Sequence, residues 1–219
     1  SGFQRPIVND HSGYVFLAQA TVSCPSIYYH PGWDYNGAGN DSGLDVAAVA
    51  TGQVVYRNTT YWGGMVVQHL YRGVTVYSQY GHISSGLFAV GDNVNKGDHI
   101  AELGMVEADS PHLHWEIRKA NHPDPTKGNY WNCTLFSVRS SVENIYENPQ
   151  DWVDTHPAYS GSTCSDNQPS GDQVTLYVDA NYCGTAKVLS TGSWGDMGAL
   201  GFPDNAVSSV RVGANVKAV

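Results

Sequence analysis

Short apolar runs separated by turn residues follow one another along the chain from about residue 44 onward. The runs are rich in Val, Ile, Tyr and Trp, and Gly- or Asn-containing segments separate them, which is typical of strands joined in successive hairpins. Residues 140–153 have a spacing that allows either a short helix or an irregular strand. The pattern predicts an all-β fold of antiparallel sheets, with strands in the following segments: 43–58, 63–82, 99–105 and 112–119.

The composition changes after residue 157, where Ser, Gly, Asp and Pro become frequent. Such a segment buries too little apolar surface to become ordered, so residues 158–171 are predicted to be a linker. The sequence therefore predicts a first domain over residues 1–157 and a small β-module over residues 172–219. A core as small as that of the module is marginal, so we expect the module to depend on the first domain, a disulfide, a metal or further sequence.

Charge and hydropathy exclude two classes of partner. The net charge is −9, and the 11 Lys and Arg residues are scattered, so no basic stripe is available for a nucleic acid backbone. No apolar run approaches the roughly 20 residues that a membrane-spanning helix needs. The first residues also lack the layout of a signal peptide, so the protein is expected to be either cytosolic or exported with its signal removed.

The four cysteines favour export. Their number is even and no C-x-x-C pair occurs, which fits disulfides in an oxidising compartment better than zinc-ribbon or thioredoxin chemistry. Three pairings are possible for four cysteines. We expect Cys24 to pair with Cys133 and Cys164 to pair with Cys183, because each disulfide then stays within one predicted domain.

The first chemical signal is the segment His30-Pro31-Gly32-Trp33-Asp34. A neutral imidazole and a carboxylate are suitable ligands for Zn²⁺, and Gly32 lets the backbone bend so that both side chains converge. Taken alone, the segment is a weak signal, because short H-x₃-D matches arise by chance and more often mark a surface turn with a polar histidine.

The second signal is the pair His112 and His114. On a strand these two imidazoles share a face with Glu116, while the alternate residues point into a core. Glu116 is then a candidate hydrogen-bond acceptor for a ligand imidazole, or an exposed structural carboxylate. The third signal is His82 at the end of an apolar run, which is either at the rim of a site or in a solvated loop.

Together these residues form the set required for a catalytic zinc site, with three protein ligands, two further imidazoles and an open coordination position. No competing motif such as H-E-x-x-H, G-x-S-x-G, a Walker loop or G-x-G-x-x-G is present. Five other histidines match no motif and are predicted to be structural: His11, His69, His99, His122 and His156.

The order of these motifs resembles that of the lysostaphin and LytM-type zinc endopeptidases over residues 28–118. The order is H-x-G-x-D, a VAAVATGQVVY-like strand pair, Y-G-H-I-S, VGDNVNKGDHIAELG and P-H-L-H-W-E. The resemblance implies that His30, Asp34 and His114 bind one Zn²⁺, and that His82 and His112 are catalytic residues beside the attacking water. One departure is the long stretch at residues 35–45, which we expect to shape the groove.

The C-terminal segment contains VTLYVDANYCGTAKVLSTG and, later, Asp204-Asn205-Ala206-Val207-Ser208-Ser209. This order resembles one Greek-key motif of the βγ-crystallin fold. The resemblance implies a Ca²⁺ site, because carboxylate, amide and hydroxyl oxygens are the ligands that this ion prefers. Relatives pair two such motifs and one is visible here, so a small β-module that tethers the enzyme or blocks its groove is the alternative. The candidate calcium ligands are Asp204, Asn205, Ser208 and Ser209.

The first resemblance implies a zinc metalloendopeptidase that hydrolyses peptide bonds in peptidoglycan cross-links with a zinc-activated water. We expect a secreted, periplasmic or cell-wall-associated protein. Two alternatives stay open: a secreted protease that acts on Gly-rich proteins, and a non-catalytic cell-wall- or calcium-binding protein. Comparing purified walls with Gly-rich proteins as substrates distinguishes the first alternative from a peptidoglycan hydrolase. Measuring the zinc content distinguishes the second alternative from an enzyme.

Overall fold

The computed structural model describes residues 2–7, 11–21, 23–36, 41–71, 74–128, 130–156, 169–179, 183–190, 207 and 209–216. The chain divides into two compact units, of which the larger comprises Gly2–His69 and Thr75–Pro157 and the smaller consists chiefly of Ala158–Val219. Residues 158–168 of the predicted linker at 158–171 lie outside the described residues. The predicted domain boundary therefore stays a prediction.

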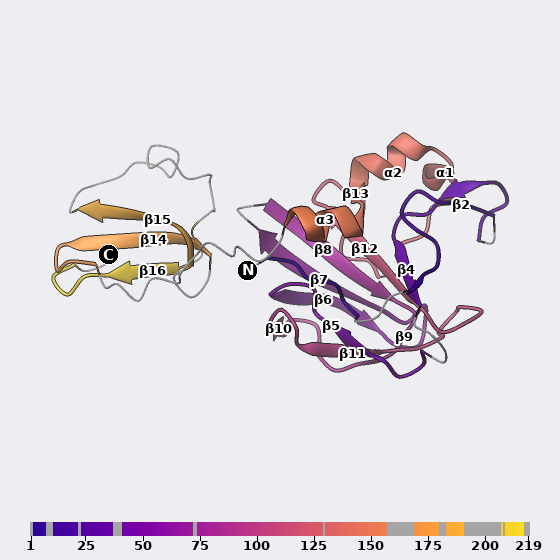
Figure 1. Cartoon of the computed structure of the whole chain (residues 1–219), viewed down its shortest axis with the longest axis horizontal. Helices are drawn as coiled ribbons and strands as arrows, with labels where there is room; N and C mark the ends of the chain where they lie inside the picture. The colour runs from indigo at the N-terminus through magenta and orange to yellow at the C-terminus, as the bar shows by residue number, and fades with distance from the viewer. Residues whose placement is uncertain are drawn as a thin grey trace. The chain divides into compact units, whose positions relative to one another are not determined.

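An antiparallel sheet of eight strands forms the centre of the larger unit (Figure 1). Its order is β1-β4-β12-β8-β7-β6-β10, and β13 pairs with β12 beside this path. The strands are β1 (His11–Ser12), β4 (Trp33–Asn36), β6 (Gly52–Asn58), β7 (Gly64–Tyr71), β8 (Val74–Gly81), β10 (Asn93–Val94), β12 (Leu113–Lys119) and β13 (Tyr146–Glu147). The prediction of antiparallel β-structure is confirmed.

Strand β12 lies inside this sheet and is buried on both faces. Leu113, Trp115 and Ile117 are fully buried on one face, as their alternation predicts. The polar side chains between them are buried as well, on the face that carries His114. Because buried polar side chains need partners, this face indicates a hydrogen-bonded network or a bound polar group.

Two smaller sheets complete the larger unit. One has the order β5-β11-β9, formed by β5 (Asp45–Ala47), β11 (His99–Leu103) and β9 (Ile83–Gly86), and the other pairs β2 (Gln19–Ala20) with β3 (Tyr28–Tyr29). The short strands before residue 44 were not predicted, because runs of two to four residues carry too little periodicity to be recognised.

Three short helices follow β12: α1 (Cys133–Phe136), α2 (Arg139–Ile145) and α3 (Pro149–Thr155). Asn132 caps α1 by accepting a hydrogen bond from the backbone N–H of Leu135, and Asn148 caps α3 ahead of Pro149. The region 140–153, for which helix and strand were both open, contains α2, the two-residue strand β13 and the start of α3.

A second, small core holds the β2–β3 segment against the helices. The predicted disulfide between Cys24 and Cys133 is confirmed, and it joins this segment to α1. The other members of the core are Ala20, Tyr28, Phe136, Val142, Ile145 and Tyr146. The disulfide and this core fix the part of the chain that leads into β4. The second predicted disulfide involves Cys164, which lies outside the described residues.

The smaller unit contains a three-stranded antiparallel sheet of order β15-β14-β16, formed by β14 (Gln173–Asp179), β15 (Cys183–Ser190) and β16 (Ser209–Val212). Ser209 begins β16 and pairs with Tyr177 of β14. The other candidate calcium ligands, Asp204, Asn205 and Ser208, lie outside the described residues, so the calcium site and the Greek-key motif stay predictions.

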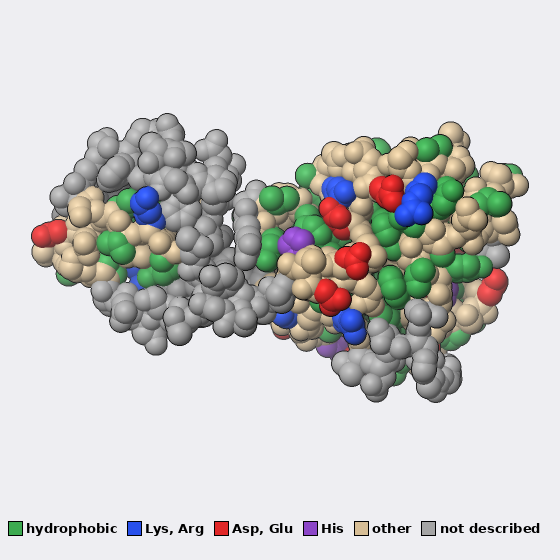
Figure 2. Space-filling view, turned by 45° about the horizontal axis from the view of Figure 1, so that its top comes forward, with side chains coloured by type: hydrophobic (Ala, Val, Ile, Leu, Met, Phe, Trp, Pro, Cys, Tyr) green, Lys and Arg blue, Asp and Glu red, His purple; other side chains and the backbone are tan. Residues whose placement is uncertain are grey.

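Lys and Arg side chains are interspersed with acidic ones on the face of the larger unit seen in Figure 2, and no basic stripe is visible there. Among the residues that the structure describes, none of the helices has the length and apolar character that a membrane span requires.

Candidate metal centre and active-site groove

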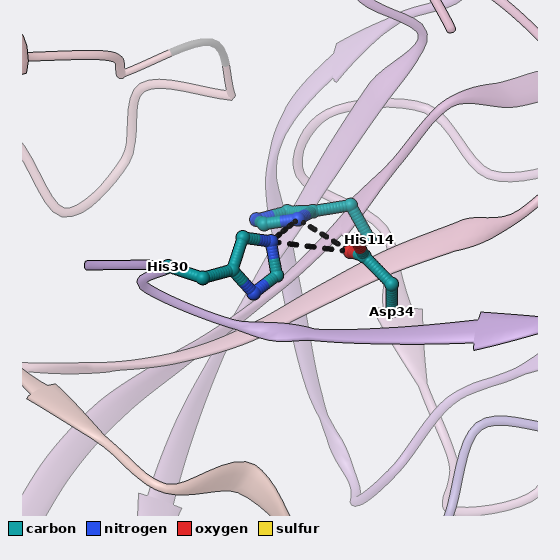
Figure 3. A group of neighbouring side chains, drawn as sticks. All are labelled: His30, Asp34 and His114. Atoms are coloured by element: carbon teal, nitrogen blue, oxygen red, sulfur yellow. Dashed lines mark hydrogen bonds and ion pairs between the residues drawn. The ribbon is translucent and has the colours of Figure 1, made fainter. Parts of the chain in front are cut away.

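Three buried side chains meet at one point between β4 and β12 (Figure 3). Asp34 lies on β4 directly opposite His114 on β12, so the sheet register places both on the same face. His30 lies four residues before Asp34, and a turn brings its imidazole to the same place. The distances are 3.0 Å from His30 Nε2 to His114 Nδ1, 2.9 Å from His114 Nδ1 to Asp34 Oδ1 and 3.3 Å from His30 Nε2 to Asp34 Oδ1.

Outer hydrogen bonds determine which nitrogen of each imidazole faces this point. His30 Nδ1 lies 2.8 Å from the carbonyl oxygen of Gly32, which can only accept, so Nδ1 carries the proton and Nε2 is left for a ligand. His114 Nε2 lies 2.9 Å from Glu116 Oε1, so by the same reasoning its Nδ1 is left for a ligand. His30 Nε2 and His114 Nδ1 can therefore each give a lone pair to an ion beside Asp34 Oδ1, once the protons that they share with this carboxylate are released.

This donor set fits Zn²⁺. Ligand atoms roughly 2.0–2.2 Å from a tetrahedral zinc ion lie about 3.3 Å from one another, close to the distances between these three atoms. Two imidazoles and one carboxylate are a ligand set found in catalytic zinc sites, which keep the fourth position open. The site therefore fits the ion that the sequence predicts, with a small outward adjustment of the ligands.

The electrostatics of the site favour positive charge at the same point. Burial by itself raises the pKa of Asp34, but hydrogen bonds with His114 and His30 outweigh it and hold this pKa far below its usual range. Burial lowers the pKa of His114, yet its hydrogen bonds to Asp34 and Glu116 raise it to about 9. The three side chains thus favour a positive charge beside Asp34. A divalent cation would supply that charge.

Gly32 is required by a close approach as well as by a bend. A Cβ atom at this position would lie 2.5 Å from the carbonyl oxygen of Trp115, 3.0 Å from Glu116 Cγ and 3.0 Å from His114 Nε2. No side chain fits there without displacing β12 or the imidazole of His114. The sequence predicted the bend at Gly32 but not this contact.

His82 and His112 lie beside the metal centre, with their ring centroids 4.5 Å apart. His82 Nδ1 donates to the carbonyl oxygen of Val106 at 2.8 Å, and His112 Nδ1 donates to that of Ser110 at 2.9 Å. Each ring therefore keeps Nε2 available for proton transfer, and His112 Nε2 is 3.9 Å from Asp34 Oδ2. Burial, reinforced by the charges of His114 and His112, lowers the pKa of His82 to about 4, so this ring is neutral at pH 7.

These five residues line one groove of about 860 Å³. Its lining also includes Asn36, from the long stretch expected to shape the groove; residues 37–40 of that stretch lie outside the described residues. None of the described lining residues is Lys or Arg. Five aromatic and two further acidic side chains line the walls: Tyr14, Tyr28, Tyr61, Trp62, Trp131, Glu107 and Asp109.

Trp62 is a groove residue that no motif in the sequence predicts. Its backbone has a φ of +61°, and its carbonyl oxygen accepts a hydrogen bond from the N–H of His82, whose φ is +62°. The indole lies against Gly81, where a Cβ atom would be 2.7 Å from Trp62 Cη2. Positive φ is rare at bulky residues and is concentrated at functional sites, but no sequence pattern reveals it.

Glu116 is fully buried, so the alternative of an exposed structural carboxylate is wrong. Burial raises its pKa, but the charge of Arg118 and the hydrogen bond with His114 lower it to about 2. Arg118 was also not predicted, although its position continues the two-residue alternation of His112, His114 and Glu116.

Of the other histidines, His69 and His122 are buried and hydrogen-bonded, His156 stacks on Trp152 and His99 is exposed. The side chain of His11 lies outside the described residues.

The metal centre and the two imidazoles beside it lie in a segment that matches a protein family. Residues 28–126 match the model of Peptidase family M23, and this segment contains all five residues of the metal centre and its flanking imidazoles. A Pseudomonas aeruginosa protein described as a lipoprotein NlpD/LppB homolog is 36% identical over 84 residues, which cover 38% of this chain and 28% of that protein. The match thus spans little more than a quarter of that relative.

A solved structure shows the same fold. A chain from the SpoIIQ–SpoIIIAH pore forming complex matches with a TM-score of 0.50 and 19% identity, covering 71% of this chain and 93% of its own. The catalytic domain of the antimicrobial peptidase lysostaphin from Staphylococcus simulans matches with a TM-score of 0.47 and 19% identity, covering 66% and 92%. The family match, rather than these structural likenesses, supports a peptidase.

Proposed function

We propose that the chain is an M23-type zinc metalloendopeptidase that hydrolyses peptide bonds in peptidoglycan cross-links. The observation that carries the proposal is the convergence of His30 Nε2, Asp34 Oδ1 and His114 Nδ1 within 3.3 Å of one another, inside a segment that matches the M23 family. These atoms would hold Zn²⁺, which when bound polarises a carbonyl group and lowers the pKa of water.

The two flanking imidazoles supply proton transfer. Because His82 and His112 each donate Nδ1–H to a backbone carbonyl, their rings are held in place with Nε2 free. One imidazole takes a proton at Nε2 as water attacks the scissile carbonyl, and the other, when it carries a proton at Nε2, gives that proton to the leaving amine. Their ring separation of 4.5 Å allows both to reach the same peptide bond.

The groove provides the binding surface for an extended peptide. Aromatic walls such as Trp62 and Trp131 offer rigid contact area that loses little entropy on binding. M23 peptidases generally act on peptidoglycan, and the Pseudomonas aeruginosa relative is a lipoprotein, which supports a substrate in the cell envelope. The Cys24–Cys133 disulfide supports export to an oxidising compartment.

The proposal is tested with zinc-loaded protein on purified cell walls and on a Gly-rich protein side by side, with products identified by mass spectrometry. We expect release of cross-link peptides from walls. His114→Ala should lose both zinc and hydrolysis, whereas His82→Ala and His112→Ala should keep zinc and lose about 10²- to 10⁴-fold in kcat. His99→Ala, at an exposed histidine outside the groove, is the matched control.

Two results would contradict the proposal. Hydrolysis of the Gly-rich protein with no release from walls would indicate a general secreted protease. Stoichiometric zinc with no hydrolysis of either substrate would indicate a binding protein that keeps the fold.

A further inference from the structure

Three buried side chains form a row along one face of β12: His114, Glu116 and Arg118. The row starts at the metal centre and leads away from it. Glu116 uses one carboxylate oxygen for His114 Nε2, at 2.9 Å, and the other for Arg118 Nε, at 2.7 Å. Glu116 and Arg118 are both completely shielded from solvent. The ligand imidazole is therefore connected through an ion pair to a residue four positions further along the strand.

Arg118 extends this row into a different segment of the chain. Its Nη1 donates to the carbonyl oxygen of Lys127 at 2.5 Å and to that of Pro125 at 3.3 Å. Next along the chain, Gly128 lies so close to Tyr56 that a Cβ atom there would be 2.0 Å from Tyr56 Cε1. The segment is thus held by hydrogen bonds from Arg118 and by close contact between Gly128 and the ring of Tyr56.

The same segment leads into the wall of the groove. Trp131, four residues after Lys127, lines the groove and has its ring centroid 6.5 Å from that of His114. Beyond it, Cys133 forms the disulfide with Cys24. The hydrogen bonds of Arg118 therefore join a metal ligand to the segment that carries one groove wall.

Stability alone is a weak reason for this arrangement. A buried ion pair recovers little more than the cost of removing both charges from water, and apolar residues of similar volume often stabilise a fold as well. Apolar residues, however, cannot accept a hydrogen bond from the Nε2–H of His114, and this bond is what keeps Nδ1 directed at the metal. The fork of Arg118 likewise matches a carboxylate and two carbonyls at once, which a lysine cannot.

We propose that Glu116 and Arg118 are positioning residues of the metal centre. Glu116 holds His114 with Nδ1 toward the ion, and Arg118 couples that ligand to the segment 125–131, so that metal binding orders this wall of the groove. The proposal rests on the proposed function, because it takes the zinc site as its starting point.

Zinc affinity tests the first half independently of hydrolysis. In competition with a chelator, Glu116→Gln should bind zinc about 10- to 100-fold more weakly than the wild type. Glu102→Gln, on β11 outside the groove, is the control and should bind zinc as the wild type does. The visible absorption spectrum of the Co²⁺-loaded protein should also change in Glu116→Gln and not in Glu102→Gln, since it reports the geometry of the ligands.

Hydrogen–deuterium exchange tests the second half. Zinc should slow exchange at β4, β12 and residues 122–131 of the wild type. In Arg118→Met it should slow exchange at the two strands only, and Arg118→Lys, which keeps the charge, should recover part of the protection at 122–131. If Arg118→Met does not fold, the Lys variant alone decides, through its smaller zinc-dependent protection at 122–131.

The outcomes separate the two proposals. A wild-type protein that binds no zinc overturns the proposed function itself. A wild type that binds zinc, with unchanged affinity and Co²⁺ spectrum in Glu116→Gln, overturns the role of Glu116. Undiminished zinc-dependent protection of 122–131 in both Arg118 variants overturns the role of Arg118.

Discussion

His69 should make the larger unit sensitive to mild acid. The side chain lies in β7 and is only 2% exposed. Its Nδ1 donates to the carbonyl oxygen of Thr51 at 3.0 Å, and its Nε2 accepts from the hydroxyl of Ser78 at 2.7 Å. Burial lowers the pKa of His69 from 6.5 to about 4, against a smaller opposite effect of the bond to Thr51. The native state therefore needs the neutral imidazole.

The sign and size of the effect follow from this shift. Because the unfolded chain takes up the proton near pH 6.5 and the folded chain only near pH 4, the full contribution of His69 to stability is present above pH 6.5. It declines as the pH falls from 6.5 to 4. The total loss is about 3 kcal/mol, of which about 2 kcal/mol is reached at pH 5.

Urea unfolding at pH 7 and pH 5, followed by tryptophan fluorescence, measures this loss. A chelator in the buffer removes the contribution of metal binding. His69→Gln should be less stable than the wild type at pH 7, because it leaves the buried partners without their hydrogen bonds, but it should lose about 2 kcal/mol less between the two pH values. Equal losses in the wild type and His69→Gln would refute the reasoning, and the exposed His99→Gln should behave as the wild type.

Three further variants test other parts of the structure. Gly32→Ala should lower stability by about 1–3 kcal/mol and weaken zinc binding in chelator competition, and unchanged affinity would show that the close contact with β12 is not needed. Replacing Cys24 and Cys133 by Ser opens a link across 109 positions of sequence and should cost about 2–5 kcal/mol in urea unfolding. An unchanged unfolding midpoint would contradict this. Glu107→Gln with Asp109→Asn should reduce the preference for Lys-containing over Glu-containing peptides about two- to fivefold in kcat/KM, and an unaltered ratio would dissociate these carboxylates from substrate choice.

The sequence predicts the strands better than it predicts their pairing. Alternation and apolar runs reveal β6, β7, β8, β11 and β12, because each is long enough to show a period. The helices contain four to seven residues, too few to repeat a 3.6-residue pattern, so only the region of α2 and α3 was considered helical at all.

The site residues are predictable as a set, whereas their geometry is not. The order of the motifs predicts that His30, Asp34 and His114 belong to one site. The strand register that sets His114 opposite Asp34 cannot be predicted in this way, because it depends on pairing between strands about eighty residues apart. Alternation places Glu116 on the ligand face without saying that this face is buried. The role of Trp62 depends on a positive φ and on a contact with Gly81, and neither is visible in a linear pattern.

A crystal of the zinc-loaded protein, with anomalous scattering at the zinc edge and elemental analysis of the same sample, tests the central claim most directly. We predict one zinc ion per chain, roughly 2.0–2.2 Å from His30 Nε2, Asp34 Oδ1 and His114 Nδ1. A protein without zinc, or an anomalous peak away from these three atoms, would contradict it.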